Sequence, residues 1–193
     1  MARQTHNRPA ASNSDMAKNQ PSEDEPLSAA APKRRIHGYP PVADEHSRVL
    51  ILGSMPSVRS LETGFYYGHK QNAFWRILSD VFSRPLPASV AQKTALLLEN
   101  RVALWDVIAS CERKGSLDSA IRGAAINDFQ PFFELHPQIR AVLLNGGTAY
   151  SRFPARLAGS REVLRLPSTS PAYTLPYDRK LAAWRDALRR FLP

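Results

Sequence analysis

Cysteine is the scarcest reactive residue of the chain: Cys111 is the single one among 193 residues. One thiol cannot form a disulfide within the chain. Nor can it supply the several thiolates of an iron–sulfur cluster or of a cysteine-based structural zinc site. We therefore expect a protein of a reducing compartment, the cytoplasm, with no metal and no other cofactor.

Long hydrophobic runs are also missing. The longest apolar stretches, such as residues 49–52 and 141–144, have only four residues, whereas a helix that spans a bilayer needs roughly 18 apolar residues. No charged segment followed by an apolar segment and a cleavage site opens the chain. We expect neither a transmembrane nor a secreted protein, and no membrane partner.

Acidic residues are few, since 17 Asp and Glu stand against 26 Lys and Arg, for a formal net charge of +9. Residues 1–36 carry only +2 of this charge, are rich in Ser, Pro, Ala, Asn and Gln, and lack aromatic residues. They are predicted to form a disordered tail ahead of one folded domain, residues 37–193. The +7 of that domain favours a polyanionic partner such as nucleic acid, although basic surfaces also arise without one.

Four short, almost continuously apolar segments are typical of strands that are buried on both faces of a sheet. These strands are predicted at 48–53, 101–105, 140–144 and 162–166, and helices at 73–82, 89–100, 117–122, 128–135, 148–158 and 178–192. Alternating strands and helices indicate a three-layer α/β/α sandwich on a parallel sheet. In such folds a ligand binds beyond the carboxyl ends of the strands.

Two segments near those strand ends stand out. Residues 53–57 are mostly small, so their backbone N–H groups can approach an anion or a sugar closely, but an ordinary tight turn explains them as well. Residues 64–75 hold five aromatic side chains and a histidine, which favours a stacking platform for a flat ligand. Asn72 in this segment is either a helix N-cap or a functional amide.

Taken together, several motifs give the chain a specific resemblance to a known family. They are Leu50 to Pro56, Asn72-Ala73-Phe74-Trp75, Leu104 to Val107, Gly115 to Asp118, and Leu166 to Ala172. From about residue 39 to 192 the chain resembles the uracil-DNA glycosylase superfamily, most closely its hypoxanthine-DNA (deoxyinosine) glycosylase branch. The resemblance implies a four-stranded parallel sheet and an enzyme that flips a deaminated base out of DNA and hydrolyses its N-glycosidic bond.

Two departures from the superfamily pattern shift the predicted catalytic group. In the first motif, counted from Gly53, efficient uracil enzymes place Asp or Asn at the third position, where this chain has Met55. In the last motif, which is the superfamily's second catalytic motif, they begin with His, where this chain has Leu166. The resemblance to the hypoxanthine branch therefore assigns the water-positioning role to Asn72. Fast uracil excision is not expected, and hypoxanthine is the preferred base, with uracil or xanthine as further substrates.

The same resemblance assigns the residues that hold the base. Asp106, at the end of a strand, would accept the N1–H of hypoxanthine, unless it only caps a turn. Tyr67 is the first choice to stack on the base and Phe74 the second, although either could belong to the core. The leaving base would be held by backbone N–H groups of Gly53, Ser54 and Met55, with His69 as a helper.

DNA binding is predicted mainly in the motif that begins at Leu166. A rigid, hydroxyl-rich loop would clamp phosphate, and the residues after it would enter the space left by the flipped base. The clamp consists of Pro167, Ser168, Thr169, Ser170 and Pro171, followed by Ala172 and Tyr173, and Ser57 contributes to the geometry of the first loop.

No lysine occupies a motif position suited to Schiff-base chemistry, so a monofunctional glycosylase that leaves an abasic site is expected. We expect it to act as a monomer on double- or single-stranded DNA, associated with the nucleoid. Three alternatives stay open. They are a mismatch-directed uracil glycosylase, a catalytically weak DNA-binding member of the superfamily, and a small-molecule transferase, for which no nucleotide-phosphate loop is found.

Overall fold

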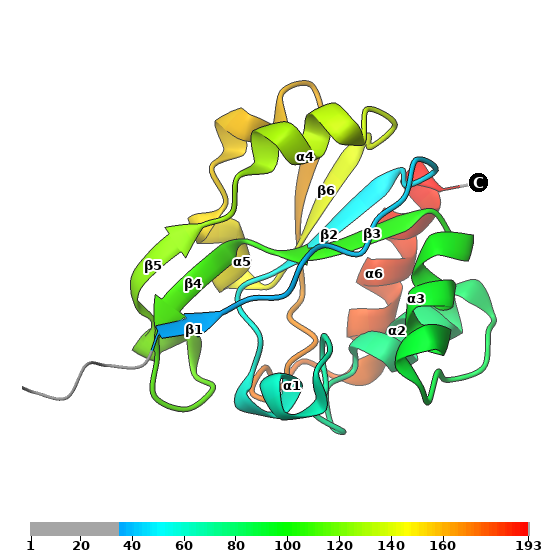
Figure 1. The fold of residues 1–193 in the computed structure, drawn as a ribbon. Coiled ribbons are helices and arrows are strands. Elements are labelled where there is room, and N and C mark those ends of the chain that lie inside the picture. The colour runs from blue at the N-terminus through cyan, green and yellow to red at the C-terminus, as the bar shows by residue number, and fades with distance from the viewer. Residues whose placement is uncertain (1–34, 193) are drawn as a thin grey trace, which may run out of the picture. The chain divides into compact units, whose positions relative to one another are not determined.

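The computed structural model describes residues 35–192, and a parallel sheet lies at their centre (Figure 1). Its strands are β2 (Val49–Gly53), β3 (Val102–Asp106), β6 (Ala141–Asn145) and β7 (Glu162–Leu166). They are hydrogen-bonded in the order β3-β2-β6-β7, and each neighbouring pair is parallel. The four predicted strands and their parallel arrangement are confirmed.

Helices cover both faces of this sheet. On one face lie α2 (Phe74–Phe82), α3 (Val90–Glu99) and the closing helix α6 (Tyr177–Phe191). On the other face lie α4 (Phe129–Leu135) and the short α5 (Gly147–Arg152). The predicted three-layer α/β/α sandwich is therefore the architecture of the described residues.

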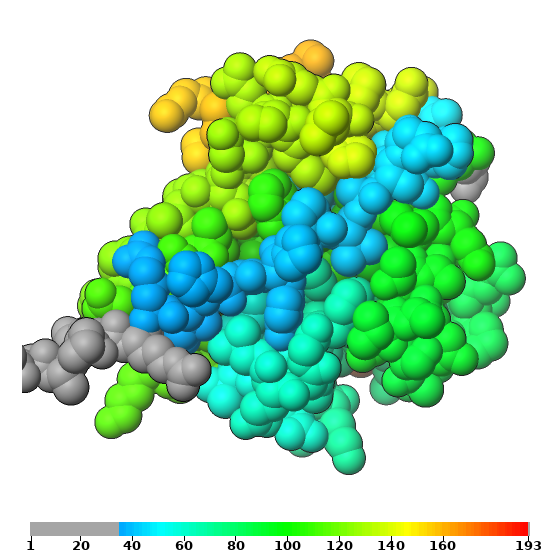
Figure 2. Space-filling view, in the orientation of Figure 1, coloured from blue at the N-terminus to red at the C-terminus, as the bar shows by residue number. Residues whose placement is uncertain are grey.

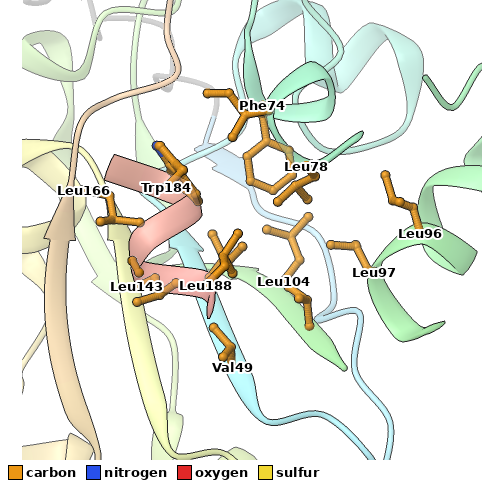
Figure 3. Packing of buried hydrophobic residues seen from close by; sticks show 14 of the residues in the cluster. Val49, Phe74, Leu78, Leu96, Leu97, Leu104, Leu143, Leu166, Trp184 and Leu188 are labelled. Atoms are coloured by element: carbon orange, nitrogen blue, oxygen red, sulfur yellow. The ribbon is translucent and has the colours of Figure 1, made fainter. Parts of the chain in front are cut away.

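The central strand β2 shows why its sequence is apolar throughout. Val49 and Ile51 belong to the core beneath α2, α3 and α6, whereas Leu50 and Leu52 belong to the core beneath α4 and α5. Successive side chains of a strand point to opposite faces, so a strand between two helical layers has no solvent-facing side. Figure 3 shows the first of these cores, in which α6 contributes Trp184 and Leu188.

A second, antiparallel sheet of three strands was not predicted. It consists of β1 (Arg35–His37), β4 (Ile108–Glu112) and β5 (Arg122–Ile126), in the order β1-β4-β5. The helix predicted at 117–122 is wrong, since this stretch holds only a 3-10 turn, η1 (Asp118–Ala120), before β5 begins. The irregular register between β4 and β5 explains why no clean alternation of apolar and polar residues marks these strands.

One further helical prediction needs correction, and one helix was not predicted. The helix predicted at 148–158 is interrupted, and α5 is followed by a separate 3-10 helix, η2 (Ala155–Ala158). Pro154 explains the break, because it has no N–H to donate and disfavours a helical conformation at the residue before it. The helix α1 (Val58–Thr63) was missed.

The segment that leads from β1 to β2 covers the edge of the parallel sheet. Val42 and Leu104 exchange two backbone hydrogen bonds, of 2.9 and 2.8 Å, so the outer edge of β3 is partly paired. Figure 2 shows this segment as a continuous strip across one face. Of the predicted tail, Arg35 and Ile36 belong to β1, and residues 1–34 lie outside the described part of the chain.

None of the helices in residues 35–192 has both the length and the apolar character needed to cross a membrane. In the same part of the chain, no three His, Cys, Asp or Glu side chains are grouped as metal ligands.

Trp184 connects the core to a loop at the carboxyl end of the sheet. Its ring is fully buried, and its Nε1 donates a 2.9 Å hydrogen bond to the carbonyl oxygen of Pro167. We predict that Trp184→Phe lowers the free energy of unfolding by about 1–3 kcal/mol, because the partly buried carbonyl loses its donor. Urea denaturation measures this change. The exposed ring of Tyr150 serves as the control, and Tyr150→Phe should shift stability by less than about 0.5 kcal/mol.

Candidate active site

A cavity of about 290 Å³ opens at the carboxyl ends of β2, β3 and β6, where the sequence predicts the ligand. This volume is at the lower end of the roughly 300–1,000 Å³ typical of small-molecule sites. Segments that are far apart in the sequence line it: residues 53–57, 66–67, 116–118, 168–170 and 172–173, together with Ser60, Asn72, Asp106 and Asn145.

Gly53 allows two polar side chains to approach the end of β2. A Cβ atom at this position would lie 2.4 Å from Oδ1 of Asp106 and 2.9 Å from the hydroxyl oxygen of Tyr67. Any larger residue would displace one of them. The absence of a side chain at Gly53 therefore brings the carboxyl group of Asp106 and the phenol of Tyr67 into one wall of the cavity.

Asp106 is only 3% exposed, and Oδ2 of its carboxyl group has no hydrogen-bond partner among the described residues. Burial, and after it the negative charge of Asp118, raises the pKa of Asp106 to about 7, against a smaller opposing effect of Arg113. Near neutral pH this group is thus divided between carboxylic acid and carboxylate. An unpartnered Oδ2 does not fit the alternative in which Asp106 caps a turn.

A second carboxylate, that of Asp118, lies in the same cavity. The hydroxyl of Ser54 donates to both of its oxygens, at 2.9 Å each. Nη1 of Arg113 lies 4.0 Å from Oδ1 of Asp118, and the buried guanidinium also donates to the carbonyl oxygens of Gly115 and Pro56. Asp118 is therefore stabilised by a hydroxyl and a cation, whereas Asp106 has no comparable compensation.

Asn145, at the end of β6, connects the two sides of the cavity. Its Nδ2 donates to the hydroxyl oxygen of Tyr67 at 3.0 Å and to Oγ1 of Thr169 at 2.9 Å. Its Oδ1 accepts a hydrogen bond from the backbone N–H of Thr169 at 2.9 Å. One amide thus fixes both the aromatic wall and the loop 167–173.

Asn72 lines the cavity two residues before the start of α2. Its Oδ1 accepts a 3.0 Å hydrogen bond from the backbone N–H of Phe74, the first residue of α2, but the N-cap position is held by Ala73 and has no side-chain cap, so the predicted N-cap role of Asn72 is wrong. This bond orients the amide and occupies one of the two lone pairs of Oδ1, which leaves the other for a further donor. This local hydrogen bond and a position in the cavity wall are therefore compatible.

Most of the other predicted site residues also line this cavity. They are Ser54, Met55, Ser57, Tyr67, Ser168, Thr169, Ser170, Ala172 and Tyr173. Three of these side chains have partners that reduce their freedom. Ser57 caps α1 through its hydroxyl, Thr169 is 1% exposed and bonded to Asn145, and Met55 packs in the core of the second sheet.

The structure does not bring four predicted residues into the cavity lining. His69 is exposed and lines a neighbouring cavity instead. Phe74 is fully buried and stacks behind Tyr67, with ring centroids 3.9 Å apart, so it supports the wall without forming it. Pro167 and Pro171 are part of the loop 167–173 but do not belong to the lining. Of the five aromatic side chains in residues 64–75, only those of Tyr66 and Tyr67 therefore line the cavity.

The sequence interpretation assigned no role to Asn145 or Asp118. The sequence held a signal for Asn145, because this residue directly follows the predicted strand 140–144. It thus lies at the edge of the sheet where parallel strands present ligand-binding residues. Asp118 belongs to a motif of the family resemblance, but its contact with Ser54 spans 64 positions of the chain. Only the fold reveals that contact.

The raised pKa of Asp106 predicts a cost in stability that Asp106→Asn removes. Between about pH 4 and 7 the folded chain keeps the proton that the unfolded chain releases, so the penalty grows as the pH rises and is complete above about pH 7. Each tenfold difference in acidity is worth about 1.4 kcal/mol. We predict that the variant is more stable than the parent by a few kcal/mol at pH 8, and that this advantage vanishes near pH 4.

Urea denaturation of both proteins across this pH range measures the difference. The exposed Asp186 on α6 provides the control, because Asp186→Asn removes the same charge from a solvated site. An advantage of Asp106→Asn that is constant with pH would contradict the assignment of a raised pKa.

Comparison with known proteins identifies the family. The model of the family described as the uracil DNA glycosylase superfamily matches residues 40–191. The chain is 33% identical over 154 residues to a hypoxanthine DNA glycosylase of Methanosarcina barkeri, covering 79% of this chain and 98% of the relative. It is 35% identical over 153 residues to the hypoxanthine DNA glycosylase of Methanosarcina acetivorans, covering 79% and 97%.

A solved structure agrees with this assignment. The solution NMR structure of a candidate uracil DNA glycosylase from Methanosarcina acetivorans superimposes with a TM-score of 0.73 at 34% identity. The similarity covers 81% of this chain and 98% of that one. Because the family model spans most of the chain, and relatives above 30% identity are matched over nearly their whole length, the chain belongs to the uracil DNA glycosylase superfamily.

Proposed function

We propose that the protein is a monofunctional hypoxanthine DNA glycosylase, which flips the deaminated base out of DNA and hydrolyses its N-glycosidic bond to leave an abasic site. The observation that carries the proposal is that one cavity, at the carboxyl ends of the parallel strands, is lined by both Asn72 and Asp106. The relatives that match the chain over nearly their whole length carry the same activity in their names.

The reaction needs a positioned water and a hold on the leaving base. Cleavage of a deoxynucleoside passes through an oxocarbenium-like state, in which positive charge develops on the sugar. Asn72 would accept a proton of the attacking water through the free lone pair of Oδ1, and thus orient it. An amide is too weak a base to remove that proton early, so the rate depends mainly on how well the departing base is stabilised.

Asp106 would read the edge of the base. Its carboxylate accepts a charge-assisted hydrogen bond from the N1–H of hypoxanthine, whereas the N1 of adenine carries no proton and repels it. The unpartnered Oδ2 supports this role, because a bound base would supply the missing donor. Tyr67 would stack on the base, with Phe74 behind it and Asn145 holding its hydroxyl.

The wall of the cavity also offers contacts to DNA. Ser168, Ser170, Ala172 and Tyr173 lie on the cavity wall and would contact the DNA next to the flipped nucleotide. The described lining includes no lysine that could attack the sugar, which supports hydrolysis without strand cleavage. Because one chain supplies the whole described lining, we propose a monomer that works at the chromosome in the cytoplasm.

A single experiment tests the proposed reaction. Duplexes containing inosine opposite thymine are incubated with the protein, then treated with alkali, which cleaves the strand at an abasic site. Strand cleavage after alkali, but not before it, is the expected result.

The uracil edge also presents an N–H to Asp106, so a G·U duplex tests the mismatch-directed alternative. Faster turnover of G·U than of I·T would favour that alternative, and no abasic product on any deaminated base would leave only DNA binding.

Replacement of Asn72 tests the position of the water. We predict that Asn72→Ala lowers single-turnover excision of hypoxanthine by roughly two to four decades, the range of one positioned catalytic group, with little change in DNA affinity. Asn72→Asp keeps an oxygen acceptor at the same place and should retain most of the activity.

Asn72→Ala also removes the hydrogen bond to the N–H of Phe74 at the start of α2, and this loss needs its own control. Asp128 caps α4 through a hydrogen bond from the N–H of Gln130 and does not line the cavity. Asp128→Ala should therefore cost about 1 kcal/mol of stability, as other lost caps do, and leave excision unchanged. Equal excision by Asn72→Ala and the parent protein would remove Asn72 from the mechanism.

The pH dependence of excision tests Asp106. Since its pKa is raised to about 7, the acceptor form increases between pH 6 and 8, and we predict that hypoxanthine excision rises over this interval. Asp106→Asn should lower the rate by about ten- to hundred-fold at pH 8 and flatten the profile. Single-turnover rates on matched duplexes with inosine, uracil, xanthine or adenine provide the measurement. An unchanged rate and an unchanged ranking of bases would assign base reading to backbone groups.

A further inference from the structure

A second cavity, of about 500 Å³, opens beside the candidate active site. Its lining comes from residues 67–76, from residues 86–93 around the connection between α2 and α3, and from residues 175–180 at the start of α6. Tyr67 and Asn72 line both cavities. The two cavities are therefore neighbours that share part of one wall.

The second cavity is strongly cationic. Lys70, Arg76, Lys93 and Lys180 line it, and the described lining includes no carboxylate. All four ion pairs formed within residues 35–192 involve other cations. The carboxylate of Asp80, on α2, accepts a 2.5 Å hydrogen bond from the hydroxyl of Tyr177. A concave surface with charges of one sign attracts and retains an anion.

Two of these cations are partly removed from water. Lys180 is 5% exposed and donates from Nζ to the carbonyl oxygens of Ser170, at 3.2 Å, and Tyr173, at 2.7 Å, so it holds the loop of the first cavity. Lys93 is half-buried, with its Nζ 5.4 Å from the centre of the Trp75 ring. Burial lowers the pKa of both lysines, which is the mark of a charge that has lost hydration.

Arg76 is oriented by an aromatic ring. Its guanidinium carbon lies 4.0 Å from the centre of the Tyr177 ring. A guanidinium group that stacks on an aromatic face keeps its N–H groups at the rim, where they suit the oxygens of a phosphate. Together with the exposed Lys70, the cavity thus combines oriented and solvent-exposed phosphate donors.

We propose, on the basis of the function proposed above, that this second cavity binds the phosphodiester backbone of the damaged strand on one side of the flipped nucleotide. The ligand is the strand that carries the damaged base. Because the cavities share Asn72 and Tyr67, a strand with its flipped nucleotide in the first cavity reaches the second within one or two nucleotides. Backbone binding here would hold the sugar against the water that Asn72 positions.

Charge-neutral variants test this assignment. The double variant Lys70→Gln/Lys93→Gln removes two cations of the second cavity without touching the first. The control Arg140→Gln/Arg156→Gln removes the same charge from exposed side chains; Arg140 directly precedes β6, at the opposite end of that strand from the cavities. Dissociation constants of duplexes containing inosine are measured over a range of salt concentrations.

The salt dependence of affinity measures how many phosphate contacts a variant has lost. For duplex DNA, each phosphate contact contributes about −0.9 to the slope of log affinity against log salt. The Lys70→Gln/Lys93→Gln variant should reduce the magnitude of this slope by about 1–2, and the control should leave it unchanged. Equal slopes for the two double variants would overturn the proposal.

Truncated substrates show which strand segment is bound. Single strands are prepared in which inosine lies progressively closer to either end. The parent protein should lose affinity when the nucleotides on one side are removed, and the Lys70→Gln/Lys93→Gln variant should be insensitive to truncation on that side only. Sensitivity to both sides in the variant would contradict the assignment.

A small anionic molecule is the other possible source of the phosphate. Calorimetry with deoxyadenosine monophosphate tests it. Saturable binding at micromolar concentration that disappears in the double variant would indicate a metabolite site and overturn the proposal. The binding measurements do not require catalysis. If the parent protein excises no base, yet the slope and truncation results hold, the proposed function fails while the strand-binding cavity stands.

Discussion

The carboxyl group of Asp106 is the constraint on which the site depends. It is buried at the end of β3, and its Oδ2 has no partner among the described residues. Gly53 leaves space for it, and the nearby negative charge of Asp118 adds to its cost. A fold selected only for stability would place an apolar residue or a paired group there. The cost is understandable if hypoxanthine supplies the missing donor, so stability is exchanged for selective binding.

A network of hydrogen bonds holds the rest of the cavity around this group. Asn145 fixes Tyr67 and Thr169, Lys180 holds the same loop through two carbonyl groups, and Trp184 donates to a third. Because these donors come from β6 and α6, the position of the loop follows from the packing of the sandwich. The site is thus rigid where the base would bind, and cationic where the strand would leave it.

The sequence predicts those parts of the fold that depend on repeated apolar patterns. The three buried strands β2, β3 and β6 and the closing helix have such patterns, and the rule that ligands bind at strand ends leads directly to Asp106 and the loop 167–173. The second sheet escapes prediction because β5 is mostly exposed, with small residues, and its register with β4 is irregular. Contacts between distant residues are equally invisible, which is why the contact between Asp118 and Ser54 was missed. His69 and Phe74 were misplaced because aromatic density does not reveal which side chains face a cavity.

The ionisation of Asp106 with and without the base tests the central claim most directly. Carbon-13 NMR of the carboxyl group, in protein labelled at aspartate, gives its pKa in the free protein and in the complex with abasic DNA and free hypoxanthine. The account predicts a pKa near 7 in the free protein that falls when hypoxanthine is bound, since N1–H stabilises the carboxylate, and that does not fall with adenine. A pKa that is normal in the free protein, or that responds equally to both bases, would contradict it.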